Sequence, residues 1–214
     1  MAEAASTREK LLDAAAHLFA ERGIDTVSIA EIVRRAGQRN SSAVHYHFGS
    51  RDAVLVALLE RHVPDIRSRR LELLQAAKAQ PGADPRAAAE AIVRPITEFA
   101  QRGWRERAYL QYGSELAHQL DRLPPEVQEL LRETSGYEAW DLLRARGPRL
   151  SKKIWLERRA ICTAFVGRAA ADRAALLDRG GEHPVLSDDS FVDNLIDMVI
   201  GAMTAPSTVR SRGR

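Results

Sequence analysis

Five polar side chains that can hydrogen-bond to nucleic acid lie close together between residues 41 and 47. Hydroxyls and imidazoles on a short helix can reach phosphate oxygens, and they can reach base edges in a DNA major groove about 12 Å wide. Val44 lies among them and is expected to face the protein core. The five residues are Ser41, Ser42, His45, Tyr46 and His47.

Other chemistry for the same segment has less support. His45 and His47 could bind a metal ion, but residues two apart on a helix point in different directions, and no Cys, Asp or Glu stands at zinc-site spacing. Tyr46 could be a core aromatic rather than a phosphate contact. The sequence has no nucleophile elbow, phosphate-binding glycine loop or H-E-x-x-H motif. We therefore expect no catalytic residue, no metal and no cofactor.

Two short helices with a tight turn between them are expected around these residues. Ser28 and Glu31 have the spacing of a capping box, which predicts a helix that starts at Ser28 and ends at Ala36–Gly37. A second short helix is expected over residues 42–47, after a polar turn. Two such helices, the second with a polar outer face, are the parts of a helix-turn-helix.

Helices this short bury too little surface to be stable alone, so longer neighbours must support them. An apolar face over residues 7–22, stopped by Gly23, predicts one supporting helix before them. Ser50 is expected to cap a fourth helix that begins near Asp52. The four helices should pack as one unit.

The rest of the chain has helical periodicity too, and no alternating strand pattern. Pro64 and Pro95 fall inside helical patterns and are expected to kink the helices or mark their ends. The further predicted helices cover residues 86–102, 104–120, 124–146, 151–178 and 188–204.

These patterns predict an all-α protein of about nine helices. A three-helix N-terminal helix-turn-helix DNA-binding domain is expected over residues 1–51. A larger helical domain is expected over residues 52–204. Residues 205–214 are expected to form a disordered tail.

The composition fits a folded protein, with 45% hydrophobic and 29% charged residues in 214. The net charge of +3 does not identify a nucleic-acid partner, because a GC-rich coding sequence also yields many arginines. The longest uncharged stretch, residues 198–209, is too short for a membrane span, and the N-terminus lacks the build of a signal peptide. Cys162 is the single cysteine, more typical of a buried small side chain than of a redox sensor. We therefore expect a cytoplasmic protein with no membrane partner.

About a quarter of the chain resembles the N-terminal domain of TetR-type repressors, with hydrophobic, glycine and capping positions in the same order. The residues that carry the resemblance are Thr7–Arg8, Ala14–Ala15, Leu18–Glu21, Gly23, Thr26–Ile29, Ile32, Ala36–Gly37, Tyr46–Phe48, Ser50–Arg51 and Leu55.

The resemblance implies a homodimer that binds double-stranded DNA at an inverted-repeat operator. It also implies that the domain over residues 52–204 binds an effector and dimerises. This sequence departs from the family in two ways. The segment from Gly37 to Phe48 is one residue longer than usual, and Ser42 and His45 stand where glycine and tyrosine are common. Phosphate contacts therefore carry over better than base contacts. The DNA-binding residues that the resemblance implies are Thr26, Ser28, Asn40, Ser41, Ser42, His45, Tyr46, His47 and Arg51.

Dimerisation is predicted through the last two helices, because small residues recur along one helical face and the final helix is apolar on two sides. Both faces could instead belong to the core of one chain. The predicted interface residues are Ala160, Ala164, Gly167, Ala171, Phe191, Leu195, Met198 and Ala202.

Aromatic residues in the middle helices could line a pocket for a lipophilic or aromatic effector, although a helical core has the same composition. The candidate ligand-binding residues are Phe99, Trp104, Tyr109, Tyr112, His118, Trp140 and Phe165.

The sequence therefore predicts a dimeric DNA-binding transcriptional regulator, most readily a repressor released by a small ligand. The alternative is a regulator or activator controlled by a protein partner, without a small-molecule pocket. Helix four, from about Asp52, is expected to be the only continuous element that joins the two domains, and a bend at Pro64 would couple them.

Overall fold

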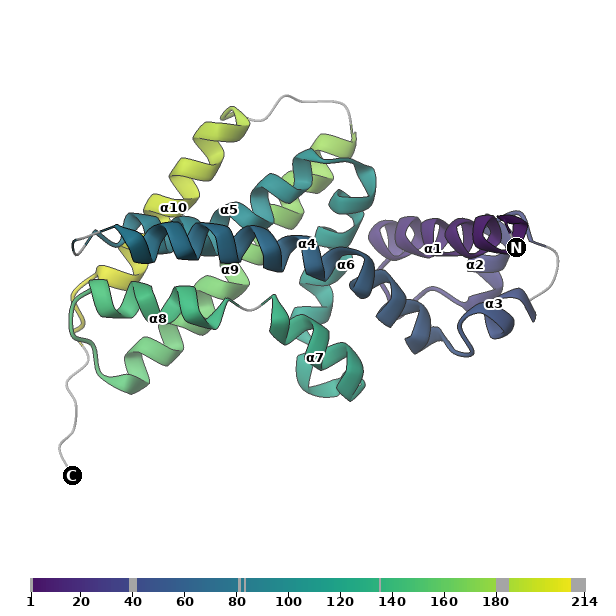
Figure 1. The fold of residues 1–214 in the computed structure, drawn as a ribbon, viewed down its shortest axis with the longest axis horizontal. Coiled ribbons are helices and arrows are strands. Elements are labelled where there is room, and N and C mark those ends of the chain that lie inside the picture. Colours follow the sequence, from purple (N-terminus) through teal and green to yellow (C-terminus); the bar gives the residue numbers. More distant parts are fainter. Residues whose placement is uncertain are drawn as a thin grey trace.

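The computed structural model describes residues 2–38, 42–80, 82, 84–134, 136–179 and 185–208. In these ranges the chain forms ten α-helices, two short 3-10 helices and no strand, which confirms the all-α prediction with one α-helix more than expected. Figure 1 shows α1, α2 and α3 grouped at one end of an elongated molecule. The elements are α1 (Ala2–Arg22), α2 (Ile29–Arg35), α3 (Ser42–His47), α4 (Arg51–Ala79), α5 (Arg86–Thr97), η1 (Glu98–Gln101), α6 (Trp104–His118), η2 (Leu120–Arg122), α7 (Pro125–Glu133), α8 (Tyr137–Arg146), α9 (Lys152–Arg179) and α10 (Asp188–Thr204).

Side-chain caps set the starts of the helices around α3. The Ser28 hydroxyl accepts a hydrogen bond from the Glu31 backbone N–H, and the Glu31 carboxylate accepts one from the Ser28 N–H at 2.9 Å. The predicted capping box is therefore confirmed. The Ser50 hydroxyl caps α4 by accepting from the backbone N–H of Ala53 at 3.1 Å, also as predicted.

The predicted single helix over residues 124–146 is wrong, because the chain breaks between α7 and α8. Gly136 has a φ of +67°, a left-handed conformation that glycine adopts without steric cost. A Cβ at Gly136 would lie 2.9 Å from the Nε of Arg70 on α4. The break therefore makes room for a side chain that is 66 positions earlier in the sequence.

Arg70 is a buried cation, only 6% exposed, that binds two backbone carbonyls. Its Nε donates to the Ala91 oxygen at 3.2 Å, and its Nη1 donates to the Thr134 oxygen. Pro95 has no N–H, so it leaves the Ala91 carbonyl without a helical partner, and the Thr134 carbonyl lies at the end of α7. Burial lowers the pKa of the Arg70 guanidinium to about 10. Arg70 thus stabilises both the proline position in α5 and the end of α7.

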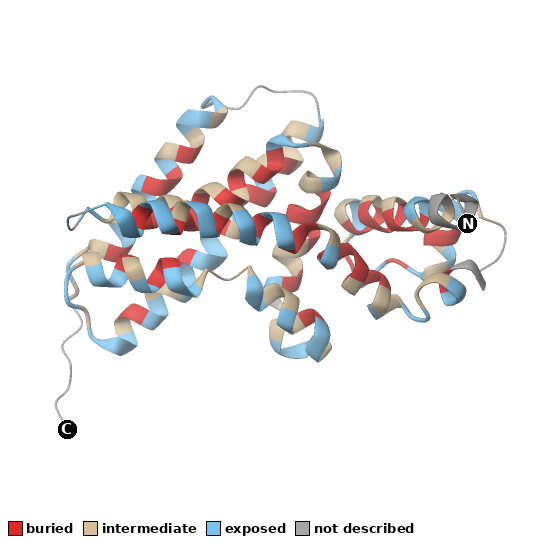
Figure 2. Ribbon diagram, viewed as in Figure 1, coloured by how far each residue is buried: buried red, intermediate tan, exposed pale blue. Residues whose placement is uncertain are grey.

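Two hydrophobic clusters fill the described part of the molecule. One unites α1, α2 and α3 with parts of α4, α6 and α9, and the other unites α5, α8, α9 and α10. Ile96 packs against both clusters. Figure 2 shows the buried positions on the sides of the helices that face one another.

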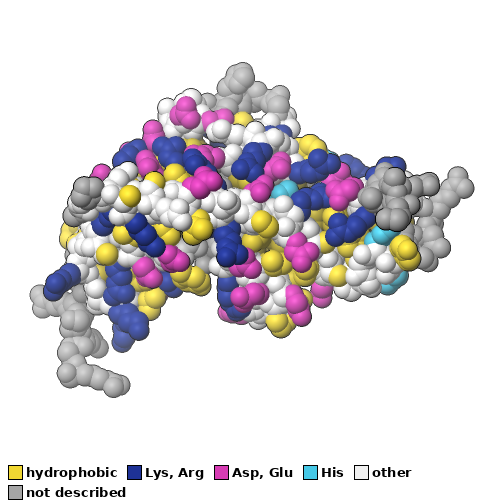
Figure 3. All heavy atoms as spheres, viewed as in Figure 1, with side chains coloured by type: hydrophobic (Ala, Val, Ile, Leu, Met, Phe, Trp, Pro, Cys, Tyr) yellow, Lys and Arg dark blue, Asp and Glu magenta, His cyan; other side chains and the backbone are white. Residues whose placement is uncertain are grey.

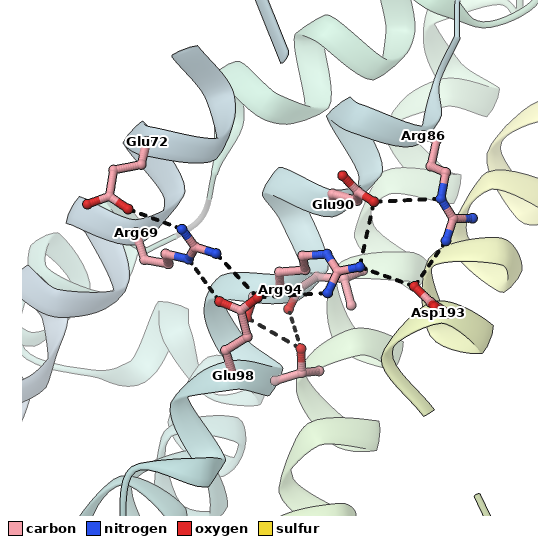
Figure 4. Close-up of polar contacts among 9 residues, drawn as sticks. Arg69, Glu72, Arg86, Glu90, Arg94, Glu98 and Asp193 are labelled. Carbon is pink, nitrogen blue, oxygen red and sulfur yellow. Dashed lines mark hydrogen bonds and ion pairs between the residues drawn. The ribbon is translucent and has the colours of Figure 1, made fainter. Parts of the chain in front are cut away.

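Ion pairs on the surface join α10 to α5, and α4 to η1 (Figure 4). Arg86 and Arg94 of α5 lie 3.0 and 3.1 Å from the same carboxylate oxygen of Asp193 on α10. Arg69 of α4 contacts Glu98 at 2.8 Å. These residues are partly exposed, so each pair adds little stability. Together they favour one placement of α10 across α5.

Candidate nucleic-acid interface

α2 and α3 are consecutive helices whose buried apolar residues belong to the same hydrophobic cluster. Ile32 and Val33 of α2 and Val44 of α3 are buried, as the sequence predicts for Val44. Gly37, with a φ of +69°, ends α2 in the left-handed conformation. The burial of one side of each helix leaves the other side of α3 free to face a partner. Asn40 and Ser41 lie outside the described residues.

The outer side of α3 exposes aromatic and imidazole groups. Tyr46 is 83% exposed, which excludes the core role considered for it, and its ring lies edge-on to His47 with centroids 5.0 Å apart. His45 is exposed, and its Nδ1 lies 3.0 Å from the carbonyl oxygen of Gly49. Ser42 is the first residue of α3. α3 therefore presents polar ring groups at the end of the molecule.

Thr26, Ser28 and Arg51 all make contacts inside the unit. The Thr26 hydroxyl donates to the Arg22 carbonyl at 2.7 Å, and the Ser28 hydroxyl donates to the Glu31 carboxylate at 2.8 Å. The hydrogen bond from the Ser28 backbone and the contact with Arg22 lower the pKa of Glu31 to about 2. Arg51 is half-buried and donates to the carbonyls of Ile24 and Val27. These residues hold the α1–α2 turn beside the start of α4.

Arg8 is a cation near α3 that the predicted set of DNA contacts did not include. Its guanidinium lies 5.1 Å from the ring centroid of Phe48, next to the end of α3. The two residues are far apart in sequence, so only the packing of α1 against the helix-turn-helix could reveal their contact. Arg8 adds positive charge beside the polar face of α3.

Charges of both signs are mixed over the surface, as Figure 3 shows for one face of the molecule. At the end that carries α3, histidine side chains are visible next to basic ones. The basic residues of α2, Arg34 and Arg35, are exposed. DNA recognition by this chain would therefore depend on local groups rather than on a large field of one sign.

Two helices, not one, connect the helix-turn-helix to the rest of the chain. Asp13 of α1 accepts from Arg61 of α4 at 3.0 Å and from Arg105 of α6 at 2.8 and 2.7 Å. At the other end of α6, the Glu115 carboxylate accepts from the Ile24 N–H at 3.3 Å. The expectation that helix four alone joins the two parts is therefore wrong, because α6 packs along α1.

The candidate ligand-binding aromatics do not share one cavity. Phe99, Tyr109 and Tyr112 are buried and form a filled ring cluster with His62, with ring centroids 5.2 to 5.7 Å apart along the cluster. Trp104 stacks on His17 of α1 at 3.8 Å.

Trp140 and Phe165 lie apart from that cluster. Trp140 lines a groove of about 280 Å³ between α6, α8 and α9, together with Tyr137, Arg159 and the small residues of α9. Phe165 is 37% exposed on α9. The side chain of His118 lies outside the described part. The sequence could not separate a filled core from a cavity, because both need the same residue types.

The predicted dimer residues fall into exposed and buried sets. Ala160, Ala164, Met198 and Ala202 are exposed, Gly167 and Phe191 are half-buried, and Ala171 and Leu195 belong to the core of this chain. Ile161 and Leu156 are exposed apolar residues of α9 that the prediction did not include. Cys162 is buried, as expected.

Among the described helices, none has the length and apolar character that a membrane crossing needs. Residues 205–208 of the predicted tail are described, and the Ala205 carbonyl accepts from Arg158 at 2.6 Å. No group of three or more metal-ligating side chains occurs in the described ranges.

Comparison with known proteins agrees with this geometry. Residues 11–58 match the family model for bacterial regulatory proteins of the tetR family. The chain is 35% identical over 86 residues to the HTH-type transcriptional repressor KstR2 of Rhodococcus jostii (strain RHA1), which is 40% of this chain and 39% of that protein. The matches span only 27 to 42% of the length of the curated relatives.

Solved structures resemble almost the whole chain in fold. A TetR-family transcriptional regulator from Bordetella parapertussis 12822 superposes with a TM-score of 0.63 at 16% identity, over 90% of this chain and 93% of that one. The regulator FadR from Bacillus subtilis, in complex with stearoyl-CoA, superposes with a TM-score of 0.56 at 14% identity, over 91% of this chain and 98% of that one.

Proposed function

We propose that this chain, a member of the TetR family of bacterial regulatory proteins, is a dimeric repressor whose sequence-specific DNA binding is relieved by a small lipophilic or aromatic ligand. The observation that carries the proposal is α3, which buries Val44 and exposes His45 and Tyr46 at the end of the molecule. A short helix with this division is suited to enter a major groove. The proposed DNA-binding unit comprises residues 1–51, and residues 52–204 form the regulatory unit.

Selection from a random double-stranded DNA library tests the DNA-binding part. Because one α3 helix makes few base contacts, we expect an inverted repeat whose half-sites lie about 34–36 Å apart, or somewhat more. Recovery of no preferred sequence would refute the proposal. The proposed contacts to the DNA backbone are Thr26, Tyr46, His47 and Arg51, and the proposed contacts to bases are Ser42 and His45. Ser28, Asn40 and Ser41 remain proposed as DNA-binding residues.

We place the dimer interface on α9 and α10. Exposed apolar side chains occur on both helices, including Ile161 at 60% and Met198 at 48% exposure. Covering such side chains with the same surface of a second copy is favourable and gives two-fold symmetry. Sedimentation velocity at micromolar concentration should show a dimer, and Ile161→Glu should shift it towards monomer. A stable wild-type monomer would refute this interface.

We place the effector in the groove between α6, α8 and α9. Tyr137 and Trp140 supply aromatic surface, Ala160 and Ala164 leave space, and Arg159 supplies a polar contact. A mostly apolar concave surface with few polar groups is typical of a ligand site. A thermal-shift screen of lipophilic and aromatic compounds tests this, because a ligand of the folded state raises Tm. Ala164→Phe should fill the groove and abolish the shift.

A second candidate is control by a protein partner. The cluster of Phe99, Tyr109 and Tyr112 favours it, since these aromatic rings are buried and pack against one another. Failure of every compound in the screen, with intact DNA binding, would favour this candidate over a ligand-released repressor.

Coupling between the two units is proposed to run through α4 and α6. α4 is continuous through Pro64, and Figure 1 shows its N-terminal turns bending away from the axis of the remainder. A ligand that binds one bent state of α4 more tightly than another would change the separation of the two α3 helices in a dimer. The shift between the two states is limited by the difference in the ligand's affinity for them. Pro64→Ala should alter induction more than it alters DNA affinity without ligand. Induction like that of the wild type would assign the coupling to α6.

A further inference from the structure

The imidazole of His45 is held in one orientation by the turn that follows α3. Gly49 has a φ of +81°, and its N–H donates to the carbonyls of Val44 and His45 at 3.2 and 3.1 Å. This closes α3 and brings the Gly49 carbonyl within 3.0 Å of the His45 Nδ1. An imidazole fixed in this way has less freedom to lose when it contacts DNA.

The partner of Nδ1 determines what the other ring nitrogen can do. A carbonyl oxygen only accepts hydrogen bonds, so Nδ1 must carry the proton in the bond to Gly49. In a neutral imidazole the second nitrogen, Nε2, then has a lone pair and no hydrogen. No hydrogen bond to Nε2 occurs among the described residues, and the side chain is exposed. Within the described part of the chain, Nε2 is therefore an acceptor without a hydrogen-bond donor, on an exposed side chain of α3.

We propose that His45 is a specificity-determining residue that accepts, through Nε2, a hydrogen bond from the exocyclic amino group of adenine or cytosine in the major groove. These two bases alone present amino donors there, N6 of adenine and N4 of cytosine. Guanine and thymine present acceptors, which an unprotonated Nε2 cannot bind. The inference rests on the proposed function, since it assumes that α3 enters the groove.

The first experiment finds the base pair that His45 reads. Random-library selection is run at pH 8, above the range in which imidazoles usually titrate, with wild type and with His45→Ala. We expect His45→Ala to relax preference at one base pair of each half-site. His17→Ala is the control, because it removes an imidazole of α1 that stacks on Trp104 of α6 and lies outside the proposed DNA contacts. This control should leave the sequence preference at that base pair unchanged.

The second experiment identifies the group on the base. Every base pair presents both an amino group and acceptors in the major groove. The selected sequence alone therefore cannot show whether His45 contacts the amino group or an acceptor. The selected duplex is therefore made with purine in place of the adenine, or with 2-pyrimidinone in place of the cytosine, which deletes the amino group. A second duplex carries the 7-deaza form of the purine in that pair, which deletes an acceptor.

Deletion of the amino group should weaken wild-type binding about three- to tenfold, the usual range for one neutral hydrogen bond, and should not affect His45→Ala. The 7-deaza duplex should affect wild type and His45→Ala equally. The proposal is overturned if His45→Ala relaxes no base pair, or if wild type responds specifically to the 7-deaza change. If neither protein selects any sequence, the proposed DNA-binding function fails instead. Circular dichroism of His45→Ala excludes unfolding as the cause.

Discussion

The Nε of Arg51, the first residue of α4, donates a hydrogen bond to the carbonyl oxygen of Val27, 3.3 Å away. A second donor of the same guanidinium binds the Ile24 carbonyl, and the group lies 5.8 Å from the Phe19 ring centroid. Arg51 therefore fixes α4 to the α1–α2 turn, whatever it contributes to DNA binding.

Replacing Arg51 by alanine should reduce both stability and DNA affinity. Loss of the donors to two carbonyls should lower the free energy of unfolding by about 1–2 kcal/mol, measured by urea denaturation. Affinity should fall equally on operator and random DNA, because the residue contacts no base. Arg34→Ala, an exposed arginine of α2, is the control and should leave stability unchanged. If Arg51→Ala is as stable as the wild type and its DNA affinity depends less steeply on salt concentration, Arg51 is a phosphate contact and has no role in stability.

His62 should make folding sensitive to pH. Burial, and then the charge of Arg61, lower its pKa to about 4, and its Nε2 has no hydrogen-bond partner. The unfolded chain, with an imidazole pKa near 6.5, binds a proton before the folded chain does. Stability is therefore full above about pH 6.5 and falls as pH decreases towards about 4, by up to about 3 kcal/mol.

Chemical denaturation between pH 4 and 8 measures this slope. His62→Phe should flatten it and should stabilise the protein at pH 5, since a ring of similar size replaces an unpartnered polar group. An equal slope in wild type and His62→Phe would mean that other groups cause the acid sensitivity.

Asp13 should hold α1 against α4 and α6. Burial raises the pKa of its carboxyl, but the hydrogen bonds and charges of Arg105 and Arg61 outweigh this and lower it below the usual value. Its contribution is therefore complete above about pH 4 and is lost as pH falls through the lowered value. At pH 7, Asp13→Asn should cost about 1 kcal/mol.

A double-mutant cycle with Arg105→Gln tests the contact itself. The two substitutions together should cost less than the sum of their separate effects, because either one breaks the paired hydrogen bonds. Strict additivity would mean that Asp13 and Arg105 do not interact in solution. The cycle of Arg105→Gln with Glu129→Gln, an exposed residue of α7, should be additive and serves as the control.

The order of α1 to α4 could be predicted from sequence, and so could the starts of α2, α3 and α4, because caps and glycines act over a few residues. The start of α1 was wrong, since the helix begins at Ala2 rather than at Thr7. The α7–α8 break could not, since Gly136 is required by Arg70, which no local pattern connects to it. The contact of α6 with α1 was missed for the same reason: Asp13 and Arg105 lie 92 positions apart. The division of the aromatics between a filled core and a groove depends on packing, which periodicity does not determine.

Gly136→Ala tests the requirement imposed by Arg70. It should destabilise the protein by about 2–4 kcal/mol, from the left-handed backbone and from the contact of the new Cβ with Arg70. Gly37→Ala is the control, because it has a similar φ of +69° and nothing within 4 Å of a Cβ. It should cost about 1–2 kcal/mol. The two glycine substitutions are then repeated in an Arg70→Met background. If the flexible methionine makes room for the new Cβ, both should lower the free energy of unfolding by the same amount. If Gly136→Ala still costs more than Gly37→Ala by the same difference, Arg70 is not the cause.

The most direct test of the account is the ratio of dissociation constants for a scrambled duplex and for the duplex selected from a random library, both measured by fluorescence anisotropy at physiological salt. For the wild type we predict a ratio of about 10³ or more, as in specific DNA-binding proteins. Substituting the outer side of α3, in Tyr46→Ala/His45→Ala, should reduce it towards one while the fold is retained. A wild-type ratio near one, or a ratio that this double variant leaves unchanged, would contradict sequence-specific recognition through α3.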